Sequence, residues 1–288
     1  MIPLSQVPRV KIIIKDDFLQ NYKKNEIPVV MENLTQKWGA KEKWSMDYFE
    51  SLAGDKEVKL YDSKPSKDKK LQHAAETLMP LKDYFTMLKN GEKDLRMFFF
   101  NMLVEVPVLK DDFSFPDIGL NFFKKLPVMF VGGKGAKVQM HFDIDYADIF
   151  LCHFGGKKRV ILFDPSQTPL MYHVPYSFSS LYDVDFLNPD YEKYPALKDL
   201  KGQEVVMNHG DILYIPPGWW HYIIYEDIGF SMAIRAFPRG GKNLLNMLRN
   251  LLWIRSVEGL MRKILGQSWN DRNEKLAVEN TNKNIKNK

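Results

Sequence analysis

The feature that most constrains the fold is a succession of short apolar runs between Arg96 and Pro238, each bounded by turn residues. Gly132-Gly133, Gly155-Gly156 and Pro216-Pro217-Gly218 are examples of these turns. The clearest expected strands are Met97–Phe100, Val128–Val131, Lys137–Phe142, Ile149–Phe154, Arg159–Phe163, Asp211–Ile215 and Phe230–Ala236. Because no long helix separates them, the pattern favours a barrel or jelly roll over a parallel α/β sheet.

Helical patterns flank this β region on both sides. Residues 1–95 alternate between strand and helix signals, with a helix over Leu81–Lys89 that ends at Gly91 and another capped by Ser45. Residues 241–275 carry apolar side chains at helical spacing, and residues 276–288 are expected to be disordered. We therefore predict an all-β core (96–240), a double-stranded β-helix of jelly-roll type, with N-terminal α/β elements and C-terminal helices.

Composition places the chain among ordinary soluble proteins. The 41 basic and 36 acidic residues leave a net charge of +5, too small over 288 residues to indicate nucleic acid by itself. No signal peptide or membrane span is visible, and a single cysteine, Cys152, is typical of a reducing, cytoplasmic compartment. The stretch Lys56–Lys70 holds six lysines and is interpreted as a solvated, mobile loop, with a docking patch for an acidic partner as the alternative.

Two segments far apart in the chain carry metal-ligand chemistry. His141 and Asp143 stand two residues apart at the end of an expected strand, so their side chains share one face. His221 follows the Pro216-Pro217-Gly218 turn and opens the next expected strand. Two imidazoles and one carboxylate on one side of a metal leave positions open, an arrangement typical of non-haem Fe(II) oxygenases. Catalytic zinc, manganese or nickel remain alternatives on ligand chemistry alone.

Several blocks in this order resemble the JmjC, cupin-like hydroxylases, particularly the branch of the asparaginyl hydroxylase that inhibits hypoxia-inducible factor. The blocks include His141-Phe142-Asp143, the run from Gly156 to Phe163, Asn188-Pro189-Asp190-Tyr191 and the run from Gly210 to His221, and the likeness spans residues 27–240. The resemblance implies Fe(II) at His141, Asp143 and His221, with 2-oxoglutarate and dioxygen as cosubstrates. It also implies that Lys158 holds the distal carboxylate of 2-oxoglutarate.

The sequence departs from that family around the cosubstrate. A tyrosine and a threonine that assist the carboxylate there correspond to Phe98 and Val138, which have no donor. Asn101, Gln139 and Tyr214 are the candidates for replacing them. Arg235 stands where the family has an asparagine, and it is predicted either to bind a carboxylate of the cosubstrate or substrate or, preferably, to form an ion pair with Asp145 or Asp148.

The remaining histidines and aromatic residues are given structural interpretations. His153, His173 and His209 are predicted to be structural, and Cys152 is expected to face away from His153 because adjacent strand residues alternate. Trp219 and Trp220 are expected to pack around the metal and exclude water.

The resemblance implies a hydroxylase, and a protein side chain is the preferred substrate. An RNA base or a small molecule is the alternative, with nucleic acid not favoured and no membrane involved. A cupin that binds metal without catalysis is an alternative, but it would have no need of Lys158 as a carboxylate anchor. A metal-dependent isomerase or dioxygenase that ignores 2-oxoglutarate is a further alternative. The apolar C-terminal helices predict a homodimer, unless they cover the outside of the barrel.

Overall fold

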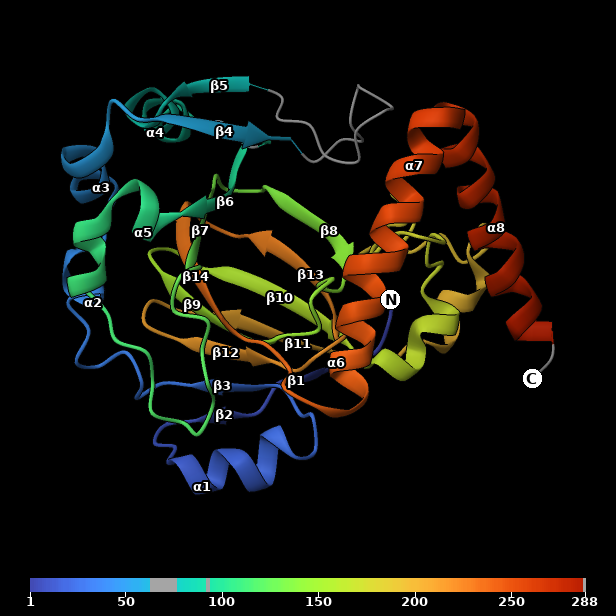
Figure 1. Ribbon diagram of the computed structural model, residues 1–288, viewed down its shortest axis with the longest axis horizontal. Coiled ribbons are helices and arrows are strands. Elements are labelled where there is room, and N and C mark those ends of the chain that lie inside the picture. Colours follow the sequence, from blue (N-terminus) through green and yellow to red (C-terminus); the bar gives the residue numbers. More distant parts are fainter. Residues whose placement is uncertain (63–76, 92–93, 287–288) are drawn as a thin grey trace.

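Two facing β-sheets form the centre of the computed structural model, which describes residues 1–62, 77–91 and 94–286 (Figure 1). The smaller sheet has five strands in the order β1 (Leu4–Gln6), β11 (Gly202–Met207), β10 (Lys158–Phe163), β13 (Trp220–Tyr225) and β8 (Lys137–His141). The larger has nine, in the order β2 (Arg9–Val10), β3 (Val29–Met31), β12 (Ile212–Ile215), β9 (Asp148–Phe154), β14 (Gly229–Ala236), β7 (Val128–Gly132), β6 (Arg96–Asn101), β4 (Glu57–Tyr61) and β5 (Thr77–Pro80). The predicted jelly-roll core of cupin type is confirmed, and all seven expected strands are present.

Alternation along the strands divides the apolar side chains into three clusters. Val160 and Leu162 of β10 meet Leu151 of β9 and Leu213 of β12 in the space between the sheets. The opposite face of the larger sheet packs against the N-terminal segments, and that of the smaller sheet packs against residues 163–200 and α8 (Gln267–Lys286). The apolar side chains of this interior cluster are buried, so the middle of the space between the sheets is shielded from water.

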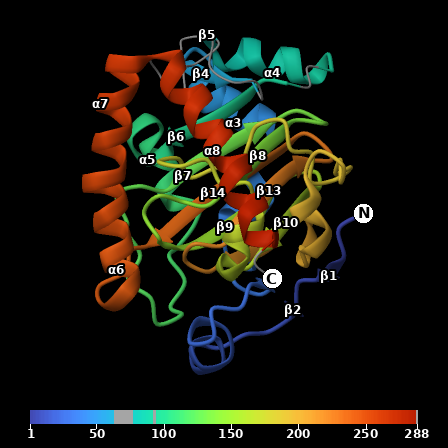
Figure 2. The same cartoon turned by 90° about the vertical axis from the view of Figure 1, so that its right-hand side faces the viewer.

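Helices surround the sheets without entering the space between them (Figures 1 and 2). The N-terminal helices are α1 (Lys15–Asp17) with its π-helical continuation Phe18–Lys23, α2 (Gly39–Lys43), α3 (Met46–Ala53), α4 (Leu81–Lys89) and α5 (Met102–Glu105). Short 3₁₀ helices follow at Pro107–Asp111, Pro165–Leu170 and Pro195–Asp199. The predicted cap is present, since the Ser45 side chain accepts a hydrogen bond from the amide of Tyr48 at 3.2 Å.

The C-terminal segment is helical for longer than the sequence indicated. It consists of α6 (Gly241–Leu248), a π-helical turn (Arg249–Ile254), α7 (Arg255–Leu265) and α8. The prediction that residues 276–288 are disordered is wrong up to Lys286, because Ala277 and Thr281 are buried and Tyr172 donates a hydrogen bond to Asn282 at 3.1 Å. None of the described helices combines the length and apolar character needed to cross a bilayer.

One polar contact ties the C-terminal helices to the sheets. Asn250, in the π-helical turn, is 1% exposed, and its amide donates to the carbonyl of Ile144 at 3.1 Å. Ile144 lies between Asp143 and Asp145, in the loop that follows β8. The position of this loop therefore depends partly on the helices.

The lysine-rich stretch is only partly a loop. Glu57–Tyr61 forms β4, which pairs with β5 and β6, because Val58 and Leu60 alternate inward between exposed polar neighbours. This part of the loop prediction is wrong. The remainder, residues 63–70, lies outside the described residues.

Candidate metal and cosubstrate site

Strand pairing brings the three predicted metal ligands together. His141, the last residue of β8, is directly opposite His221 in β13. The tight turn before β13 contains Gly218 at φ +75°, and a Cβ there would approach the Tyr146 ring to 2.9 Å. Glycine is therefore required for the chain to turn and deliver His221 to the mouth of the sandwich.

The two imidazoles are oriented for metal binding. The Nδ1 atom of His141 lies 2.7 Å from the carbonyl of Gln139, and that of His221 lies 3.1 Å from the carbonyl of Trp219. A carbonyl can only accept, so each Nδ1 carries the proton and each Nε2 presents a lone pair. The Oδ1 atom of Asp143 is 3.6 Å from Nε2 of His141 and 4.0 Å from Nε2 of His221. A cation with bonds of about 2.1 Å to each atom spans these gaps.

The charge states also suit a divalent cation. Burial, with His221 nearby, lowers the pKa of His141 to about 4, and burial lowers that of His221. Burial acts to raise the pKa of Asp143, but Arg235 and the two histidines outweigh it and hold this pKa at about 2. At neutral pH the site therefore offers two neutral imidazoles and one carboxylate, the donor set of a non-haem ferrous centre.

Arg235 forms the predicted ion pair and a second one. One of its terminal nitrogens, Nη1, lies 2.8 Å from Oδ2 of Asp145 and 2.8 Å from Oδ2 of Asp143. Asp148, the other suggested partner, pairs instead with Lys23 at 2.9 Å. Because Arg235 occupies Oδ2 of Asp143, the carboxylate presents Oδ1 to the histidines.

Replacing Arg235 with methionine is expected to destabilise the metal-free protein by about 3 kcal/mol, because Asp143 and Asp145 would face each other without a buried cation. A bound divalent cation would replace part of the lost charge, so Mn²⁺ should raise the melting temperature of Arg235→Met more than that of the wild type. Thermal unfolding with and without Mn²⁺ measures this difference. Arg235→Lys, which keeps the charge, is the control, and equal Mn²⁺ effects in all three proteins would contradict the explanation.

Lys158 is the second charged group of the interior. It is 1% exposed, its Nζ donates to Oγ of Ser231 at 2.5 Å and lies 4.1 Å from the centre of the Tyr225 ring. Burial lowers its pKa to about 7, and in the described part of the chain no ion pair with a carboxylate offsets this. Its neighbour Lys157 is exposed, as the sequence indicated.

The structure separates the other suggested cosubstrate contacts. Tyr214 is on the outer face of the larger sheet, where its hydroxyl donates to Asp148 at 2.7 Å, so the suggestion that it contacts the cosubstrate is not supported. The amide of Gln139 donates to the carbonyl of Ser180 at 2.8 Å. Asn101 is opposite Val128, an interior residue, and donates to the carbonyl of Lys125 at 3.3 Å, so its role stays a prediction.

Two of the three histidines predicted to be structural lie within hydrogen-bond distance of backbone carbonyls. His173 lies 2.8 Å from the carbonyl of Ser177, and His209 lies 2.6 Å from that of Lys41. Cys152 packs on the outer face of its sheet, while His153 points inward to Ser231.

The two tryptophans lie on opposite faces of the chain. Trp219 packs in the interior cluster, as expected. Trp220 belongs to the outer cluster and donates to Thr168 at 3.0 Å, so only Trp219 belongs to the interior that the metal site shares.

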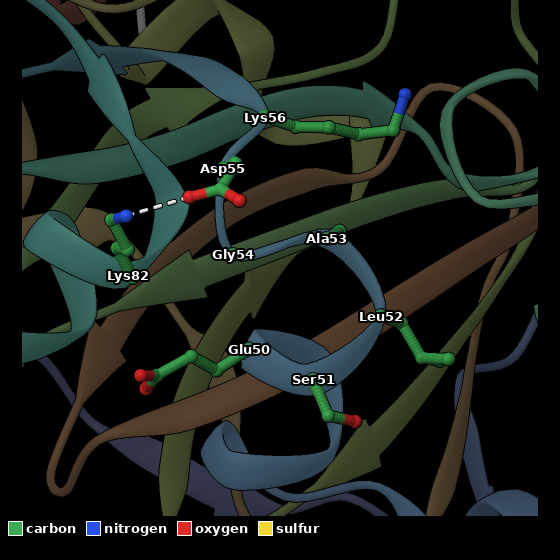
Figure 3. A pocket seen from close by; sticks show the side chains of 8 residues that line it. All are labelled: Glu50, Ser51, Leu52, Ala53, Gly54, Asp55, Lys56 and Lys82. Atoms are coloured by element: carbon green, nitrogen blue, oxygen red, sulfur yellow. Dashed lines mark hydrogen bonds and ion pairs between the residues drawn. The ribbon is translucent and has the colours of Figure 1, made fainter.

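A hollow on the surface lies apart from the triad. Figure 3 shows it at the end of α3, where Glu50, Asp55 and Lys82 are among its lining residues and Lys82 donates to Asp55 at 2.6 Å. Neither the triad nor Lys158 lines it. The candidate active site is therefore the interior between the two sheets, which contains the triad and Lys158.

Comparison with known proteins agrees with this geometry. Residues 15–239 match the family described as Cupin-like domain. The chain belongs to this cupin-like family. Among similar cupin-like proteins, tRNA wybutosine-synthesizing protein 5 is 29% identical over 255 residues in Gallus gallus (81% of this chain, 77% of that protein) and 28% identical over 253 residues in Homo sapiens (79% and 76%). Lysine-specific demethylase 8 of Xenopus tropicalis is 26% identical over 238 residues, covering 79% of this chain but 52% of that protein.

The cupin-like assignment defines the class of enzyme. With its His141, Asp143 and His221 triad, the chain is a JmjC 2-oxoglutarate-dependent oxygenase. The narrower resemblance to the asparaginyl hydroxylase branch is not supported, because the relatives found are named for tRNA wybutosine synthesis and lysine demethylation.

Proposed function

We propose that this cupin-like protein is an Fe(II)- and 2-oxoglutarate-dependent hydroxylase in which Lys158 binds the distal carboxylate of 2-oxoglutarate. The observation that carries this proposal is a buried ammonium that has no acidic partner among the described residues and lies in the same interior as an open triad of metal ligands. Burying an unpaired charge is costly, so a site of this kind favours an anionic ligand. A metal-binding protein without a dicarboxylate cosubstrate would gain nothing from it.

The metal and the cosubstrate would be bound by different residues. His141, Asp143 and His221 would hold the metal on one side, and Lys158 would fix the far end of the cosubstrate. Bound ferrous iron would supply the oxidative chemistry in which 2-oxoglutarate and dioxygen give succinate and carbon dioxide while a substrate C–H becomes C–OH. The interior apolar cluster and Trp219 exclude water from this space.

A protein side chain is the first candidate substrate. It is the substrate class that the sequence favoured, and a relative named lysine-specific demethylase 8 supports a protein target. That relative is matched over only about half of its length, so its remaining half has no counterpart in this alignment.

A tRNA nucleoside is the second candidate, and the comparisons favour it by a specific observation. The relatives named tRNA wybutosine-synthesizing protein 5 are matched over about three quarters of their own length. The net charge of +5 is compatible with an RNA substrate without requiring one.

Succinate formation by iron-loaded protein tests both the proposed activity and the substrate class. We expect slow succinate release with ascorbate and 2-oxoglutarate alone, and a stimulation by either a peptide library or total tRNA. The stimulating fraction identifies the substrate class, and mass spectrometry should then find a gain of one oxygen atom. Absence of succinate under all conditions would contradict the hydroxylase proposal.

Binding of 2-oxoglutarate is expected to weaken as pH rises. The pKa of Lys158 is about 7 before the ligand binds, and a bound carboxylate would raise it, so binding takes up a proton above that pH. The dissociation constant on Mn²⁺-loaded protein should be lowest below pH 7 and should increase by up to about tenfold per pH unit above it. The monocarboxylate 2-oxopentanoate is the control ligand, and the same pH dependence for both ligands would argue against Lys158.

The C-terminal helices are proposed to form a homodimer. Leu245 in α6, Leu252 and Trp253 in the π-helical turn, and Leu260 in α7 are each at least 58% exposed, an apolar face that is costly to leave in water. Sedimentation at micromolar concentration should find a dimer for the wild type and a monomer for Trp253→Glu. A monomeric wild type would contradict this proposal.

A further inference from the structure

A row of three polar side chains crosses one end of the interior. Oγ of Ser231, in β14, accepts the hydrogen bond of Lys158 and lies 3.0 Å from Nδ1 of His153, in β9. Ser231 and His153 are both 0% exposed. The sequence predicts a structural role for His153 and gives no indication of a role for Ser231.

Two glycines make room for this row. Gly132 and Gly229 are directly opposite each other in β7 and β14. A Cβ on Gly132 would come within 2.8 Å of the Tyr225 ring, and one on Gly229 within 2.9 Å of Cε1 of His153. The absence of side chains at this pair therefore lets the rings of Tyr225 and His153 lie beside Lys158 and Ser231.

The hydrogen bonds around Ser231 determine whether its hydroxyl proton is available to a ligand. The ammonium of Lys158 only donates, so Oγ of Ser231 accepts from it. The Nε2 atom of His153 is buried and has no hydrogen-bond partner among the described residues. We assign the ring proton to Nδ1, because Nδ1 faces Oγ of Ser231 at 3.0 Å while Nε2 has no acceptor in hydrogen-bonding geometry, even though the backbone carbonyls of Gly156 and Phe230 also interact with the ring. His153 then donates to Ser231, and the hydroxyl proton of Ser231 remains free.

We propose that Ser231, held in place by His153, donates the hydrogen bond that completes the binding site for the distal carboxylate beside Lys158. It would supply the hydroxyl that Phe98 and Val138 lack. This inference rests on the proposed function, in which 2-oxoglutarate occupies the interior. Ser231 is a cosubstrate-binding residue in this proposal, and His153 is a positioning residue.

A nucleophilic Ser–His pair does not explain the same contacts. Oγ of Ser231 is fully buried beneath Lys158, and its hydrogen bond from an ammonium makes the oxygen a poorer nucleophile. Among the described residues, His153 also has no carboxylate partner of the kind that orients a histidine general base. Carboxylate binding uses both the charge and the free proton.

Calorimetric binding to Mn²⁺-loaded protein without oxygen tests the inference independently of turnover. Two ligands are compared: 2-oxoglutarate, and 2-oxopentanoate, which has a methyl group in place of the distal carboxylate. Ser231→Ala is expected to weaken 2-oxoglutarate binding by about tenfold or more while leaving 2-oxopentanoate binding within about twofold. His153→Leu should weaken 2-oxoglutarate binding by about threefold, and adding it to Ser231→Ala should cause no further loss.

Thr35→Val is the matched control, because Thr35 is also a buried hydroxyl but donates to the carbonyl of Gly210, outside the interior. Its affinity for both ligands should equal that of the wild type. Melting temperatures show whether each variant is folded, and Ser231→Thr, which keeps the hydroxyl, should recover part of the affinity.

The outcomes separate this inference from the proposed function. Failure of the wild type to bind 2-oxoglutarate more tightly than 2-oxopentanoate overturns both. If the wild type shows that preference and Lys158→Met loses it while Ser231→Ala keeps it, the proposed function stands and the role of Ser231 is overturned. Equal losses for both ligands in Ser231→Ala would show a general structural effect and also overturn the role.

Discussion

Lys158→Met is expected to change stability and cosubstrate binding in opposite directions. Methionine keeps the length and most of the volume of lysine but removes a buried charge that has no ion-pair partner in the described residues. The metal-free protein should therefore melt at a temperature higher by about 2 °C or more. Without the ammonium, 2-oxoglutarate affinity should fall by about a hundredfold. Thermal unfolding and calorimetric titration at pH 7 measure the two effects.

Lys157→Met is the control, since this neighbouring lysine is exposed and should change neither quantity. A less stable Lys158→Met protein would indicate that Lys158 has a stabilising partner, and unchanged affinity would exclude it as the carboxylate anchor. The opposite signs make general misfolding a poor explanation, because misfolding lowers both quantities.

Asp143→Ala is expected to abolish 2-oxoglutarate turnover and to weaken Mn²⁺ binding by more than about a hundredfold, because it removes the only anionic ligand of the triad. The variant should still fold, since Arg235 keeps its ion pair with Asp145. Calorimetric Mn²⁺ titration and succinate release measure the two losses. Asp55→Ala, an exposed aspartate paired with Lys82, is the control. Retention of Mn²⁺ affinity in Asp143→Ala would exclude the triad as the metal site.

Alternation along strands made the metal site predictable. The spacing of two residues predicted a shared face for His141 and Asp143; β8 ends at His141, but Asp143 in the following loop still reaches Nε2 of His141 at 3.6 Å. The turn before His221 carries its own signal in Pro216, Pro217 and Gly218. The side of the sheet to which Tyr214 points could not be predicted from alternation, because the turn interrupts the alternation between Tyr214 and His221. Its neighbours Leu213 and Ile215 point inward, so Tyr214 points outward.

The residues that were missed have weak signals in a single sequence. Ser231 is a small polar residue in an apolar strand, and only its spacing of four residues from Arg235 indicates that both face inward. The pairing of β9 with β14 then brings His153 opposite Ser231, and such pairing depends on the whole topology. Similarly, α8 has few apolar residues, and its helix is stabilised by tertiary contacts at Ala277 and Asn282 that no local pattern contains.

The hydrogen bond from Asn250 to Ile144 bears on how the catalytic portion can be isolated. A fragment that stops at residue 240 would keep every metal ligand but lose this support for the segment between Asp143 and Asp145. Its loop would have more freedom, and the ligand geometry would be less uniform from molecule to molecule. The helical tail therefore belongs to the smallest unit that preserves an ordered metal centre.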